Sequence, residues 1–86
     1  MTVTIRYFAG ARHAAGVEQE TWPVSESLPL STLLDQLGDV GAGRPAELAA
    51  VLARCSFLVD GIAVPDRNRL LSPGQTVDVL PPFAGG

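Results

Sequence analysis

The chain opens with a regular alternation of hydrophobic and polar positions. Across residues 2–8, Val3, Ile5 and Tyr7 face one side of an extended chain, and Phe8 faces the other side. A period of two residues is typical of a β-strand with one buried face. The alanine-rich residues that follow predict a short helix or a loop.

A second strand is predicted over residues 17–24, with Trp22 and Val24 on the same face. Pro23 has no backbone N–H to donate to a neighbouring strand. We therefore expect Pro23 at a sheet edge or at a strand end.

Two helices are predicted in the middle of the chain. Ser27 or Ser31 could cap the first helix, and Gly38 could end it. Pro45 suits the first turn of the second helix. Apolar residues recur at helical spacing in both segments: Leu30, Leu33, Leu34 and Leu37, then Leu48, Val51 and Leu52.

The C-terminal part of the chain reads as a hairpin and a last strand. Asp60 and Gly61 separate two apolar runs and predict a type I′ turn. Residues 72–75 predict a tight turn, and residues 76–80 predict a strand whose valines face inward. The order strand, strand, helix, helix, hairpin, strand indicates an α+β fold, a mixed sheet packed on one or two helices. Small β-grasp (ubiquitin-like) domains have this order, with the first and last strands adjacent in the sheet centre.

Three large apolar residues do not fit the inward face. If Tyr7, Phe57 and Val79 face the helices, then their chain neighbours Phe8, Leu58 and Leu80 face away from them. An exposed apolar cluster on a small protein usually marks a binding surface. Phe83 would continue this cluster toward the end of the chain. Alternatively, each residue is singly exposed or is covered by a loop.

Composition narrows the functional classes. With 86 residues, the chain is expected to be one domain, residues 1–86. The net charge is −3 and there is no basic run, so we expect no nucleic-acid partner. No apolar run approaches the roughly 18 residues of a membrane span, and no signal segment is visible, so we expect no membrane partner and a cytoplasmic location. The chain has no lysine, which excludes lysine-based catalysis.

Cysteine and histidine are too scarce for a metal site. Cys55 is the single cysteine, and it lies where a helix pattern passes into a strand pattern. We expect a buried structural thiol there, and no internal disulfide. His13 has no cluster of ligands around it in the sequence.

The last residues, 81–86, are predicted to form a flexible tail that follows the final strand directly. Glycine has no side chain, so Gly85 and Gly86 could enter a narrow channel and bring a carboxylate to a reactive centre. A pair of terminal glycines does not stabilise a fold. The tail is therefore the strongest candidate for the functional part of the chain.

The chain resembles the ubiquitin-like sulfur carriers of the MoaD/ThiS family, most closely the MoaD type, the small subunit of molybdopterin synthase. "YFAGARHAAG" at residues 7–16 is similar to the opening segment of that family, and "SPGQTVDVLPPFAGG" at residues 72–86 is similar to its closing segment. The centre matches in pattern only. Asp60 stands where relatives often have Asn, and a Gly-rich break occurs at residues 41–43.

The resemblance implies a sulfur carrier for molybdenum cofactor biosynthesis. An adenylating (MoeB-like) enzyme would use ATP to activate the carboxylate of Gly86, and a persulfide sulfur donor would convert it to a thiocarboxylate. The tail would then enter the large subunit of molybdopterin synthase and give sulfur to a pyranopterin. The chain itself would bind no cofactor, and catalytic groups would come from the partner.

The resemblance also implies roles for particular residues. Gly86 would carry the sulfur and Gly85 would give clearance. The residues expected to contact the partner are Phe8, Leu58, Leu80, Pro81, Pro82, Phe83 and Ala84. Arg12 matches the opening segment, and it could serve docking, a structural salt bridge or a solvated surface equally well.

Three alternatives stay open. The chain could be a carrier for thiazole (thiamine) or cysteine synthesis. It could be a ubiquitin-like protein modifier that is joined to lysines through Gly86. It could also be an interaction module with an incidental tail.

Overall fold

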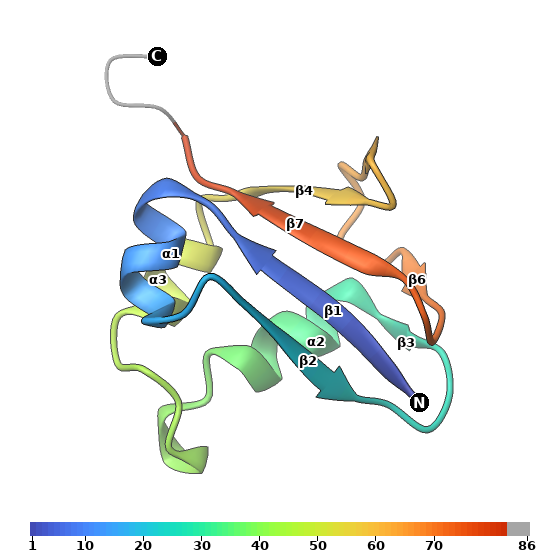
Figure 1. Ribbon diagram of the computed structural model, residues 1–86, viewed down its shortest axis with the longest axis horizontal. Coiled ribbons are helices and arrows are strands. Elements are labelled where there is room, and N and C mark those ends of the chain that lie inside the picture. The colour runs from blue at the N-terminus through green and yellow to red at the C-terminus, as the bar shows by residue number, and fades with distance from the viewer. Residues whose placement is uncertain (83–86) are drawn as a thin grey trace.

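A computed structural model describes residues 1–82, in which a twisted sheet is covered on one face by helices (Figure 1). Within those residues the main sheet has five strands in the order β2-β1-β7-β4-β5. β1 and β7 are adjacent at its centre, as predicted, and they run parallel, whereas the other neighbours are antiparallel. The strands are β1 (Thr2–Tyr7), β2 (Gln19–Pro23), β4 (Ser56–Val59), β5 (Ile62–Ala63) and β7 (Thr76–Leu80).

The helices are short. None of them in the described part of the chain is long and apolar enough to cross a membrane. The sequence pattern did not indicate a second, two-stranded sheet, in which β3 pairs with β6. These elements are α1 (Ala9–Ala15), α2 (Leu30–Leu37), the 3₁₀-helix η1 (Val40–Ala42), α3 (Leu48–Leu52), β3 (Leu28–Pro29) and β6 (Leu70–Leu71).

The core lies between the inner face of the sheet and the helices. Period-two burial along β1, β4 and β7 confirms the predicted inward faces, and the leucines of α2 complete the core. Trp22 and Val24 both pack against it at the β2 edge, and Pro23 ends that strand, as expected. The fully buried large side chains are Tyr7, Ile5, Leu30, Leu33, Leu37, Leu48, Leu71, Val3, Val59, Val77 and Val79.

The predicted serine cap of the first helix is wrong. The residue before α2 is Pro29, which has an extended backbone and makes no side-chain capping bond. The N–H groups of Leu30 and Ser31 instead donate to the carbonyls of Arg69 and Arg67, at 2.9 and 2.7 Å. A distant segment thus satisfies the free N–H groups at the start of the helix, so no side chain needs to do so.

The structure confirms one predicted turn and corrects the predicted position of Pro45. Asp60 and Gly61 have φ values of 49° and 84°, which confirms the type I′ turn of the β4–β5 hairpin. Pro45, by contrast, is not in the first turn of a helix, because α3 begins at Leu48 and Pro45 lies in the turn before it. The carbonyl of Pro45 accepts a hydrogen bond from the N–H of Leu48, at 3.2 Å, and so closes that turn.

Candidate functional site

The C-terminal segment leaves the sheet from its central strand. β7 pairs with β1 on one side and β4 on the other, and the chain continues into Pro81, which is half-buried, and Pro82, which is exposed. Because β7 is bonded on both sides, the sheet fixes the point where the tail starts (Figure 1). The tail predictions for Phe83, Ala84, Gly85 and Gly86 concern residues outside those that the structure describes.

Phe8, Leu58 and Leu80 share the outer face of the sheet, as the alternation predicted. The N–H of Phe8 donates to the carbonyl of Val79 at 3.2 Å, which extends the β1–β7 register by one residue and brings Phe8 beside Leu80. Leu58 pairs with Asp78 across β4 and β7, so it is a diagonal neighbour of Leu80. All three side chains are half-buried. We call these three residues the outer patch; it lies beside the start of the tail.

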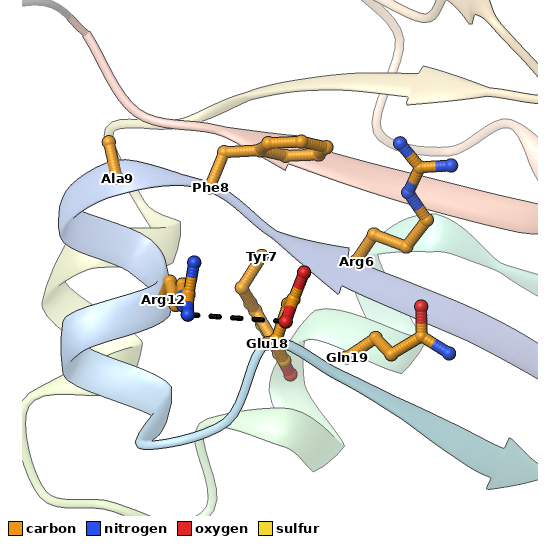
Figure 2. Close-up of a pocket in the computed structure, with 7 residues that line it drawn as sticks. All are labelled: Arg6, Tyr7, Phe8, Ala9, Arg12, Glu18 and Gln19. Atoms are coloured by element: carbon orange, nitrogen blue, oxygen red, sulfur yellow. Dashed lines mark ion pairs between the residues drawn. The ribbon is translucent and has the colours of Figure 1, made fainter.

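A charged pair lies within this surface. Nε of Arg6 lies 3.1 Å from Oδ1 of Asp78, on neighbouring strands. The Arg6 guanidinium also lies over the ring of Phe8, with Cζ 5.3 Å from the ring centre. Figure 2 shows Arg6 and Phe8 on the same side of β1. No local pattern indicated this pair, because its members are far apart along the chain.

A shallow pocket of about 280 Å³ opens beside Phe8, at the end of β1 and the start of α1 (Figure 2). Arg12 lies at its wall and faces Glu18 at 4.0 Å, with side chains 60% and 75% exposed. An ion pair at that distance and exposure adds little stability. Of the roles expected for Arg12, the structure thus provides a weak, solvated salt bridge.

A second polar cluster lies on the helix side of the sheet. The hydroxyl of Tyr7 donates to Oε2 of Glu20 at 2.6 Å, and Nη2 of Arg44 donates to the same oxygen at 2.6 Å. Burial, followed by the hydrogen bond to Glu20, raises the pKa of Tyr7, so the phenol keeps its proton. The bond to Glu20 likewise raises the pKa of Arg44. The hydrogen bonds of Tyr7 and Arg44 to one shared carboxylate tie β1, β2 and the loop before α3 together, which is a structural role.

Among residues 1–82, the remaining reactive residue types are not assembled into a site. Cys55 is buried, its thiol donates to the carbonyl of Val51 at 3.1 Å, and burial raises its pKa, which confirms a structural thiol. His13 is exposed. In the part of the chain that the structure covers, no three His, Cys, Asp or Glu residues could hold a metal ion together.

Both a family model and a curated protein match this chain over nearly all of its length. The model of the ThiS family matches residues 5–86, which includes both the outer patch and the terminal glycines. The chain belongs to the ThiS family. It is 32% identical to the "Molybdopterin synthase sulfur carrier subunit" of Chlamydomonas reinhardtii over 87 residues, which covers all of both chains.

Similar solved structures confirm the β-grasp fold. The complex of subunits 1 and 2 of the molybdopterin-converting factor of Helicobacter pylori contains a chain that matches with a TM-score of 0.68 and 22% identity, covering all of both chains. The small archaeal modifier protein 1 of Methanosarcina acetivorans matches with a TM-score of 0.72 and 19% identity, covering 99% of this chain and 96% of that one. At these identities the likeness concerns the fold alone.

Proposed function

We propose that the protein is a sulfur carrier for molybdenum cofactor biosynthesis, the small subunit of a molybdopterin synthase. The observation that carries this proposal is the full-length similarity to a molybdopterin synthase sulfur carrier subunit, in a chain whose central strand leads directly to Gly85 and Gly86. The chain would bind no cofactor of its own. Because the chemistry needs ATP, we propose a cytoplasmic location.

The proposed chemistry takes place on the carboxylate of Gly86. A carboxylate is a poor acyl donor, because oxide is a poor leaving group. An adenylating (MoeB-like) enzyme would let this carboxylate attack the α-phosphate of ATP, forming an acyl-adenylate and releasing pyrophosphate. The terminal sulfur of a persulfide donor would then displace AMP. A thiol would cleave the sulfur–sulfur bond, leaving a thiocarboxylate on Gly86 and a disulfide on the donor.

The fold suits a carrier that presents its tail and docks beside it. β7 is hydrogen-bonded on both sides, so the start of the tail is fixed. Pro81 and Pro82 have restricted φ angles, so they stiffen the exit from the sheet. The outer patch would dock on the large synthase subunit, with Phe83 and Ala84 along its channel. A partner that covers this face is thereby aligned with the tail.

Intact-mass measurement tests the proposal. The protein is incubated with its adenylating enzyme, ATP and a persulfide donor, and we expect a gain equal to the difference between a sulfur and an oxygen atom. A variant that lacks Gly85 and Gly86 should keep its fold and gain nothing. If the full chain gains no sulfur, or if the truncated chain still supports molybdopterin formation, the proposal is wrong.

A second candidate function is protein modification, which the similarity to a small archaeal modifier protein favours. Gly86 would then form an isopeptide bond with lysines of other proteins. A search for Gly-Gly remnants on target lysines separates the two functions. A carrier for thiazole or cysteine synthesis is separated by offering a thiazole synthase in place of the large synthase subunit.

A further inference from the structure

The ion pair of the outer face lies among the residues of the outer patch. Asp78 has Leu58 beside it on β4, and Leu80 two positions further along β7. Its partner Arg6 lies over the ring of Phe8. A partner that covers the outer patch must therefore also cover this pair, and it will meet whichever member is the more exposed.

The exposed member is the cation. The side chain of Arg6 is 49% exposed and that of Asp78 is 15% exposed. Oδ1 of Asp78 is fully covered and has no aligned hydrogen bond among the described residues, so its 3.1 Å contact with Arg6 is a charge contact and not a directed bond. In Figure 2 the guanidinium of Arg6 extends across β7, with its two terminal nitrogens farthest from β1. The surface thus offers a guanidinium to an incoming partner.

Docking would remove water from that guanidinium. A charge that loses its water and gains no partner is strongly unfavourable, and an arginine has five N–H groups to satisfy. A contact through Nε leaves the two terminal nitrogens of Arg6 for an outside acceptor. A carboxylate suits this position best, because its two oxygens match the planar fork of an arginine.

We propose that the large synthase subunit presents an acidic side chain to Arg6, so that Arg6 is a specificity-determining residue of the outer patch. The inference rests on the proposed function, because it takes that subunit as the occupant of the face. Apolar contact with the outer patch contributes affinity without selecting one partner. The carboxylate opposite Arg6 supplies the selection, since an apolar surface there would leave a buried charge without a partner.

Calorimetric titration of the large subunit from the same organism tests this. Arg6→Met keeps the length of the side chain but removes its charge. The double variant Arg6→Met with Asp78→Leu also removes the carboxylate that would otherwise be left unpaired. Arg69→Met is the matched control, because Arg69 is an exposed arginine beside β6 in the second sheet.

We expect both Arg6 variants to bind about tenfold more weakly or worse, because a partner carboxylate is left buried without a counter-charge. The control should bind like the wild type. Raising the salt from about 50 to about 500 mM should weaken wild-type binding and affect the double variant much less. Circular dichroism checks that each variant is folded. If Arg6→Met alone is unfolded, the affinity of the double variant tests the inference.

The two proposals fail in different ways. If the wild type binds and the double variant binds equally well or more tightly, the large subunit recognises this face through apolar contacts alone. The inference is then wrong, while the proposed function stands. If Arg6→Met impairs adenylation but not binding of the large subunit, the inference names the wrong occupant. If the wild-type chain does not bind the large subunit at all, both the function and the inference are wrong.

Discussion

At the scale of single residues, Arg44 connects three parts of the fold. Its Nε donates to the carbonyl of Leu37 at 2.9 Å, Nη2 donates to Glu20, and its guanidinium lies 5.0 Å from the ring centre of Trp22. Glu20 also accepts the hydroxyl of Tyr7. The charged side chains are each 19% exposed, so water screens this cluster less than it screens an exposed pair.

We therefore predict that Arg44→Ala lowers the free energy of unfolding by about 2–3 kcal/mol, because it leaves Glu20 half-buried without its counter-charge. Urea denaturation measures the change. Arg12→Ala serves as the control, since the Arg12–Glu18 pair is open to water, and its effect should stay within about 0.5 kcal/mol. Equal effects for the two substitutions would contradict the structural role of Arg44.

At the scale of elements, the end of α2 packs tightly against α3. A Cβ atom placed on Gly38 would lie 2.8 Å from Cβ and 3.0 Å from Cα of Ala49. The sequence predicted Gly38 as the end of the helix, and α2 does end at Leu37 with Gly38 as its C-cap. Only the structure shows that Gly38 also allows the close approach of α3, because the contact depends on a residue eleven positions later.

Gly38→Ala should therefore destabilise the protein by about 1–3 kcal/mol, because α3 backbone must move to accept the new methyl group. The matched control is Gly10→Ala in α1, where a Cβ atom would meet nothing within 4 Å. Alanine favours helix more than glycine does, so Gly10→Ala should be neutral or stabilising by up to about 1 kcal/mol. Thermal unfolding of both variants checks the prediction, which is wrong if Gly38→Ala is as stable as Gly10→Ala.

Element boundaries divide into those set locally and those set by distant contacts. The type I′ turn at Asp60 and Gly61 was predicted correctly, since two positive φ values favour that pair of residues. The start of α2 was predicted incorrectly, because its first N–H groups donate to carbonyls of the segment that leads into β6. Local patterns cannot indicate a cap that a segment nearly forty residues away provides.

At the scale of the whole molecule, the two faces of the sheet have different surroundings. Its inner face forms the core with the helices, and its outer face bears the half-buried outer patch beside the start of the tail. Two adjacent residues of β4 lie on opposite faces of the sheet. Val59 is buried in the core at 2% exposure, and Leu58 is half-buried on the outer face. Substitutions at these neighbours should therefore affect different properties.

We predict that Val59→Ala lowers the free energy of unfolding by about 2–3 kcal/mol, because it creates a cavity in the core, but leaves the affinity of the folded protein for the large subunit unchanged. Leu58→Ala removes a larger side chain, yet it should cost about 1 kcal/mol of stability and weaken binding at least tenfold. Denaturation and binding titrations give the two measurements. A Leu58 variant that is as unstable as the Val59 variant, or that binds normally, would contradict this separation.

The amino-acid sequence by itself determined the alternation of the strands, the leucine face of α2, the hairpin turn and the terminal glycines, because side-chain period and turn chemistry act within a few residues. It therefore also determined that Phe8, Leu58 and Leu80 face away from the core. Only the tertiary structure decided that Arg6 lies against Asp78 among those residues, and that Glu20 is shared by Tyr7 and Arg44. Those contacts depend on the register of strands that are distant in the chain, and register is set by the packing of the whole sheet.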